Sequence, residues 1–226
     1  MARAESSRTP RARGTEKTIY SGLLVMLLVA YMLTVAAPGA LEHGAGHLAV
    51  AVVALLLVGV GQRVRQFVGG WAGIAVLAIV AVGLGGGLSA AGVDGAVDII
   101  TALLMLGAAV ATIDRLLTAP EITVDGVIAA LSIYLLLAFA FSASYAAVQD
   151  ISGEGFFTDD QLGNRSDFLY FSVVTLTTLG YGDFVSAGSL GRGMSALEAL
   201  TGQLFLGTVV ARFVGLLRTP QRTGQS

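Results

Sequence analysis

The residues best suited to chemistry in this sequence lie at 175–183, which read TLTTLGYGD. A cation stripped of its water inside a membrane needs a shell of oxygen atoms, and consecutive backbone carbonyls provide one if they face the same way. A regular strand alternates its carbonyl directions, so alternate residues must take unusual dihedral angles, which glycine accepts at least cost. Gly180 and Gly182 have this spacing, and Thr178 adds a hydroxyl oxygen. The stretch therefore predicts a row of carbonyls that binds a dehydrated cation.

The same stretch closely resembles the selectivity-filter signature T-x-G-Y-G-D of tetrameric potassium channels, with Leu179 where valine or isoleucine is commonest. The resemblance implies that K⁺ ions bind to the carbonyls of Thr178, Leu179, Gly180 and Tyr181 and to the Thr178 hydroxyl. One chain supplies one such loop and cannot enclose a pore, which closed symmetry solves. The resemblance therefore implies a homotetramer with the filter on its axis, K⁺ as the bound ion and no other cofactor.

The resemblance also implies residues that support the filter. Gly182 and Asp183 complete the motif. Tyr170 and Phe171 occupy positions where the family often has two tryptophans, and we expect both rings to brace Tyr181.

Glu198 is the only carboxylate inside the last apolar segment, and an ionisable group at membrane depth is a functional candidate. Some potassium channels have a glutamate at the position of Val174, which pairs with the filter aspartate. We predict that Glu198 partly replaces that group by hydrogen bonding behind the filter, with Ser172, Thr175 and Tyr170 as candidate donors. The alternative is a solvated position near the outer interface.

The last apolar segment resembles the inner helix of the family from Gly191-Arg192 onward. This register places Gly202 at the position of the family's hinge glycine, although close helix packing would explain a glycine there equally well. In the same register, the cavity below the filter is lined by Gln203, Leu206 and Val210.

Composition and hydrophobic pattern predict an all-α membrane protein. The chain has 226 residues, of which 55% are hydrophobic and 12% charged, against about 25% charged in soluble domains. Six transmembrane helices are expected, and a re-entrant pore helix at 167–177, capped by Ser166, precedes the filter between the fifth and sixth. The expected spans cover residues 18–37, 47–60, 67–82, 93–113, 125–148 and 190–217.

The predicted organisation is a cytoplasmic tail at 1–17, a four-helix domain at 18–115, a pore domain at 123–217 and a second tail at 218–226. Basic residues gather on one side of this topology and acidic residues on the other, which places both termini in the cytoplasm. We expect a multi-pass protein of the plasma (cell inner) membrane, in contact with lipids. The fourth span contains Asp98 and no arginine ladder, which argues against a conventional voltage sensor.

The predicted function is passive, potassium-selective conduction by a homotetramer. The alternatives are a non-selective monovalent cation channel, a potassium-uptake or transporter subunit, and a scaffold protein with a non-conducting pore. We do not expect an enzyme, since no Ser-His-Asp or carboxylate constellation is present, nor a nucleic-acid partner, since the net charge is −2. His43 and His47 have zinc-ligand spacing, but interfacial polar residues explain the pair as well.

Overall fold

The structure is a computed structural model that describes residues 10–36, 49–54, 90–118 and 124–217. Its helices are α1 (Pro10–Ala36), α4 (Ala90–Thr118), α5 (Val124–Ser152), α6 (Arg165–Leu176) and α7 (Gly188–Leu217), with a 3-10 turn η2 (Thr158–Asp160) and a short helical segment at 49–54. These residues contain no strand, only one isolated bridge between Phe157 and Ser186. The prediction of an all-α fold is confirmed for this part of the chain.

Three of the described helices are long and apolar enough to cross a membrane. These stretches are Gly92–Leu117, Val124–Ser152 and Gly188–Arg212, and α1 adds a shorter apolar stretch, Tyr20–Ala36. The third expected span, 67–82, and most of the second lie outside the described residues, as do His43 and His47. The helices present are those of a membrane protein.

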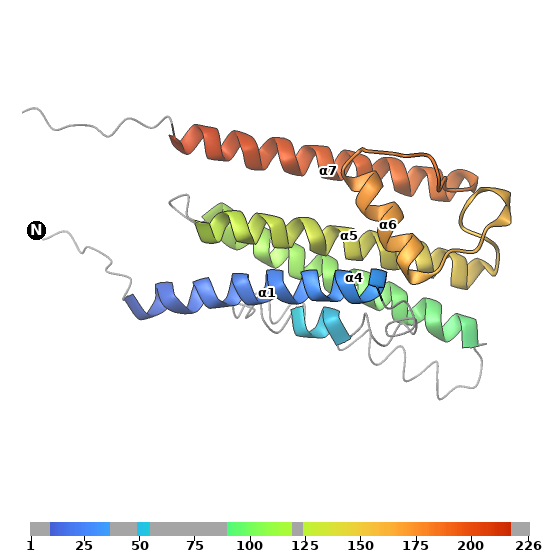
Figure 1. The fold of residues 1–226 in the computed structure, drawn as a ribbon, viewed down its shortest axis with the longest axis horizontal. Coiled ribbons are helices and arrows are strands. Elements are labelled where there is room, and N and C mark those ends of the chain that lie inside the picture. The colour runs from blue at the N-terminus through green and yellow to red at the C-terminus, as the bar shows by residue number, and fades with distance from the viewer. Residues whose placement is uncertain (1–9, 37–48, 55–89, 119–123, 218–226) are drawn as a thin grey trace, which may run out of the picture.

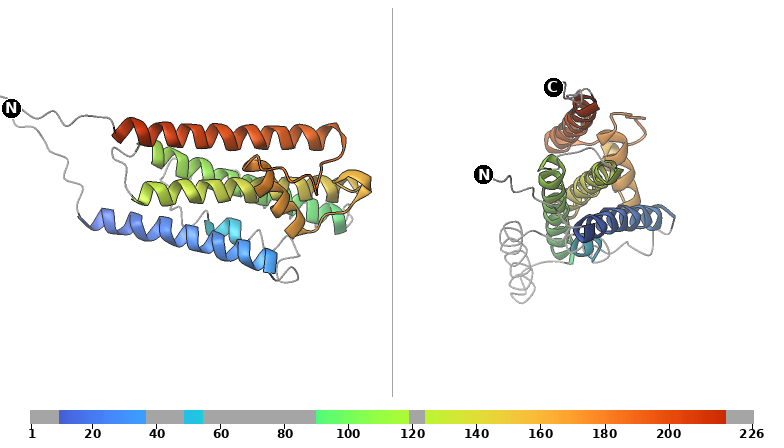
Figure 2. Two further views of the ribbon diagram at one scale, coloured as in Figure 1. Left: turned by 45° about the horizontal axis from the view of Figure 1, so that its top comes forward. Right: turned by 90° about the vertical axis from the view of Figure 1, so that its left-hand side faces the viewer.

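The four long helices α1, α4, α5 and α7 lie with their axes along nearly one direction, whereas the shorter α6 lies obliquely between α5 and α7 (Figures 1 and 2). Helices α4 and α5 follow one another through residues 119–123 and pack together along their length. The core is apolar and continuous from α1 to α6, and it includes Leu27, Met105, Ile133, Leu136 and Leu169. Burial of these side chains holds α6, and with it the loop that follows, against α5.

Several helix boundaries differ from those expected. Helix α1 begins at Pro10 rather than at residue 18, with proline in the first turn, where its missing N–H costs nothing. Helices α4 and α5 continue through residues 114–118 and 149–152, which were assigned to loops. Apolarity locates membrane spans, but helical hydrogen bonding continues into the polar residues beyond them.

The predicted cap of the pore helix was wrong. Asn164, not Ser166, caps α6: its side chain accepts hydrogen bonds from the backbone N–H groups of Ser166 (2.8 Å) and Asp167 (3.0 Å). The Asp167 carboxylate accepts in return from the Asn164 N–H at 3.0 Å, which completes a capping box. The reciprocal hydrogen bond requires an acidic residue three positions after the cap. Asp167 therefore favours Asn164 as the capping residue, and α6 begins at Arg165.

The loop after α5 is joined by backbone hydrogen bonds to the segment that follows residues 175–183. Backbone hydrogen bonds of 2.8 Å join Thr158 N–H to the Val185 carbonyl and Ala187 N–H to the Phe156 carbonyl. Beneath them, α5, this loop and α6 contribute rings to a buried aromatic cluster made of Tyr145, Phe156, Phe157, Phe168 and Phe171. The cluster and these hydrogen bonds therefore hold the start of α6 and the segment after residue 183 together.

Candidate functional site

The backbone after α6 alternates in handedness. Thr178, Gly180 and Gly182 have φ angles of +57°, +54° and +80°, while the residues between them stay at negative φ. A Cβ at Gly180 or Gly182 would meet no atom within 4 Å, so the backbone angle, not lack of space, favours glycine there. The two glycines have the conformation that the sequence indicated. The left-handed conformation of Thr178 was not foreseen, because threonine rarely adopts it.

The end of α6 holds the first half of this loop through its backbone. The Val174 carbonyl accepts hydrogen bonds from Leu179 N–H at 2.9 Å and Gly180 N–H at 3.3 Å. Val174 lacks the carboxylate that some potassium channels have at this position. It still supports the loop, because its backbone carbonyl accepts these hydrogen bonds whatever the side chain is.

The outer end of the loop is held by a tyrosine. The Tyr170 hydroxyl donates a hydrogen bond to Asp183 Oδ2 at 2.7 Å. The sequence predicted that the rings of Tyr170 and Phe171 brace Tyr181, and the single chain shows a different arrangement. Phe171 packs into the aromatic cluster beside Tyr145, and the side chain of Tyr181 is 67% exposed.

At the inner end, α7 approaches the loop. Gln203 Nε2 donates to the Thr178 hydroxyl at 3.2 Å, while Leu206 and Val210 are exposed in the single chain. The backbone of Gly202 lies so close to the Leu176 carbonyl that a Cβ would collide with its oxygen. The structure therefore gives Gly202 the packing role, and the hinge role stays a prediction.

Behind the loop, Glu198 on α7 is fully buried in the single chain. This differs from the alternative prediction, in which Glu198 was solvated near the outer interface. Its carboxyl group contacts the hydroxyls of Ser172 on α6 and Tyr145 on α5. Ser172 is one of the three donors considered. Tyr145 was missed, because a residue 53 positions earlier in the chain gives no local signal.

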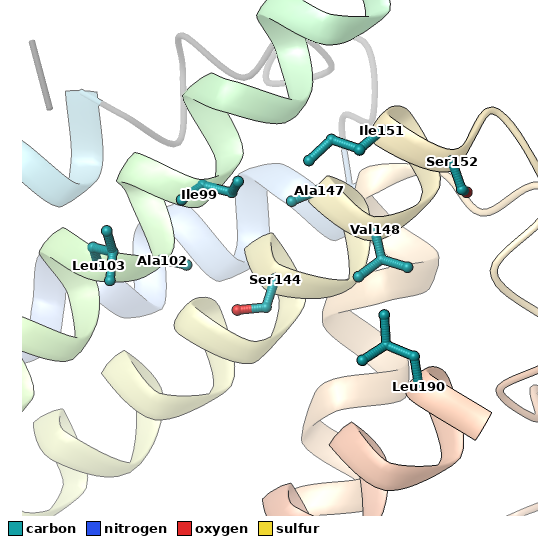
Figure 3. Close-up of a pocket in the computed structure, with 9 residues that line it drawn as sticks. All are labelled: Ile99, Ala102, Leu103, Ser144, Ala147, Val148, Ile151, Ser152 and Leu190. Atoms are coloured by element: carbon teal, nitrogen blue, oxygen red, sulfur yellow. The ribbon is translucent and has the colours of Figure 1, made fainter. Parts of the chain in front are cut away.

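A groove of about 410 Å³ lies between α4, α5 and the start of α7 (Figure 3). Its lining is apolar, for example Ile99, Val148 and Leu190, with two hydroxyls from Ser144 and Ser152. None of the described residues that line it is charged. The described residues also contain no group of three or more His, Cys, Asp or Glu side chains that could hold a metal ion.

Comparison with known proteins identifies the segment that carries this site. Residues 128–219 match the family model described as "Ion channel". The chain is 35% identical over 91 residues to "Probable potassium channel protein 2" of Methanocaldococcus jannaschii and 34% identical over 88 residues to "Protein LctB" of Bacillus caldotenax. These matches support a potassium-channel family for residues 128–219. The family recognised from the filter sequence is thereby confirmed for this segment.

The matches do not extend over whole proteins. They cover 39% of this chain and 22% of the archaeal protein, and 36% of this chain and 64% of the Bacillus protein. No solved structure matches the chain significantly. The comparisons thus concern the channel segment, which begins inside α5 and includes α6 and α7.

Proposed function

We propose that this chain is a subunit of a potassium-selective channel that conducts K⁺ passively. The observation that carries the proposal is the alternation of φ at Thr178, Gly180 and Gly182 within the T-x-G-Y-G-D stretch. Such alternation lets successive carbonyls face one axis, where they replace the hydration shell of an ion. The ligands are then the carbonyls of residues 178–181 and the Thr178 hydroxyl.

A homotetramer provides the enclosure that one loop lacks. Helix α7 is long and apolar enough to span a membrane, yet only 11% of its span is buried in the single chain, against 61% for α5. Its exposed large side chains include Leu197, Leu200, Leu204, Leu206 and Val210. In the tetramer, neighbouring copies cover part of this surface, and Gln203, Leu206 and Val210 line the central cavity.

The proposed topology has six spans, with α6 and the filter re-entering from the outer side between α5 and α7. Irregular backbone at membrane depth is tolerated where it is buried in protein or lines water, as a pore axis provides. Both termini then lie in the cytoplasm, and the protein resides in the plasma (cell inner) membrane. The helices before the pore domain form a scaffold without an arginine ladder.

Two hydrogen-bond networks support the filter in this proposal. Tyr170 holds Asp183 at the outer end, in place of the carboxylate missing at Val174. Glu198 joins α7 to Ser172 and Tyr145 behind the filter. Glu198 thus acts on the pore helix, whereas Tyr170 contacts the filter segment itself.

Recording from purified protein in planar bilayers under opposed K⁺ and Na⁺ gradients tests the function. We expect a reversal potential close to that of a K⁺ electrode. A reversal potential near zero would favour the non-selective cation channel. Absence of current from correctly assembled protein would favour a scaffold with a closed pore or a transport subunit.

A further inference from the structure

A buried ion pair links α4 to the first residue of α6. Arg165 Nη1 lies 2.6 Å from Asp98 Oδ2, and Arg165 Nη2 lies 3.5 Å from Asp150 Oδ2. The Asp98 side chain has no exposed surface, and that of Arg165 is 13% exposed. Apart from the ion pair, the Asp98 oxygens have no hydrogen-bond partner in the described part of the chain.

Each charge is unfavourable at its position without the other. Arg165 is the first residue of α6, where the helix dipole disfavours a cation. Asp98 lies inside a stretch of α4 that is apolar enough to cross a membrane, where a lone carboxylate is costly. A pair at this position therefore restricts the two helices to arrangements that keep the charges together.

The backbone of α4 is adapted to this contact. Gly95 lies one turn before Asp98, on the same face of the helix. A Cβ at Gly95 would lie 2.7 Å from Cγ1 of Ile151 at the end of α5, so a larger residue would require the Ile151 side chain to move. This close approach brings Asp98 to the end of α5 and the start of α6.

We propose that the Asp98–Arg165 pair holds α4 in one register on α6, so that a displacement of α4 reaches the selectivity filter. Buried ion pairs add little net stability compared with apolar packing, but they can specify one arrangement of elements. Helix α6 has 12 residues, about 18 Å, and its far end carries the filter loop. Arg165 and Asp98 are positioning residues, and the helices before the pore act on conduction through them. This inference rests on the proposed channel function.

A double-mutant cycle on the full-length protein tests the proposal. The variants are Asp98→Asn, Arg165→Gln and the double variant, and the readouts are single-channel burst duration and K⁺/Na⁺ selectivity. Arg165→Gln leaves the buried Asp98 without a cation, and Asp98→Asn leaves Arg165 with only its 3.5 Å contact to Asp150. We expect bursts shortened about tenfold in each single variant, with recovery to within about threefold of wild type in the double variant. Asp94→Asn is the control, since Asp94 is an exposed carboxylate one turn earlier on α4.

Changes that simply add in the double variant would overturn the proposal, as would single variants with wild-type bursts and selectivity. If the single variants fail to assemble, the assembled fraction in detergent becomes the readout. Rescue of assembly by the double variant supports the pair, and equal failure of all three refutes it. Wild-type protein is recorded first: if it passes no K⁺ current, the proposed function fails, while the assembly cycle still tests the ion pair.

Discussion

Replacement of Glu198 tests whether the buried carboxyl group supports the filter. In Glu198→Ala, the buried Tyr145 hydroxyl loses its acceptor, which costs about 1–3 kcal/mol, and the bond to Ser172 is lost at about 0.5–1.5 kcal/mol. Ser172 keeps a second partner, the Ala138 carbonyl at 2.8 Å. The total, about 1.5–4.5 kcal/mol, falls on the contacts that join α7 to α5 and α6.

Counting protons predicts a different result for Glu198→Gln. The Ser172 hydroxyl has one proton and lies within hydrogen-bond distance of both the Ala138 carbonyl and Glu198 Oε1. If that proton goes to the Ala138 carbonyl, the proton shared with Glu198 must come from Glu198 itself, as a neutral carboxylic acid. Glutamine reproduces this pattern, because its amide oxygen accepts from Tyr145 and its NH₂ group donates to Ser172.

The assay is single-channel recording combined with thermal stability of the assembled protein in detergent. We expect Glu198→Ala to shorten bursts by about tenfold or more, since 1.4 kcal/mol corresponds to a factor of ten. Glu198→Gln should remain within about threefold of wild type, and Glu154→Ala, an exposed loop carboxylate, serves as the control. Wild-type behaviour of Glu198→Ala would refute the supporting role. A glutamine variant as impaired as the alanine variant would refute the neutral acid.

Four further predictions concern the filter, the gate and the outer mouth. Gly180→Ala should abolish K⁺ selectivity or current, because alanine resists a φ angle of +54°. Gly188→Ala is the control, since Gly188 has a φ angle of +65° but lies outside the filter. Equal effects of the two variants in reversal-potential measurements would contradict the role of Gly180. Open probability should depend weakly on voltage, and a steep conductance–voltage relation that flattens on neutralising Arg115 would show the prediction wrong. Val185→Tyr should strengthen external block by tetraethylammonium through cation–π contact, measured as the blocking constant, because Val185 is 45% exposed beside the outer end of the filter. Gly202→Ala should reduce assembly, seen as loss of the oligomer peak in size exclusion, since its Cβ would overlap the Leu176 carbonyl.

The backbone conformation of Gly180 and Gly182 was predictable because it depends on local dihedral angles. A left-handed backbone at every second position selects glycine, and the spacing of Gly180 and Gly182 is visible in the sequence without any knowledge of packing. The side chains behind the filter are not local in this sense. Tyr145 contacts Glu198 only because α5 packs against α7, and no spacing rule connects the two residues.

The contact between α4 and the start of α6 also joins residues far apart in the sequence. Here, however, the sequence contained a physical signal, a carboxylate inside an apolar span. Asp98 was interpreted only as evidence against a voltage sensor, and Arg165 was assigned to a loop. A carboxylate inside an apolar span is costly in free energy, and a cation at the same depth on another segment offsets that cost. If residues 93–113 start at the outer side, Asp98 lies near the outer end, where the nearby cations are Arg165 and Arg192. Arg192 follows the filter and donates to the Gly188 carbonyl in its own helix, whereas Arg165 is the first residue of α6 and reaches Asp98. Comparing the membrane depths of charged residues would therefore have left two candidate cations for Asp98, Arg165 and Arg192. Only the packing of α4 on α5 decides between these two.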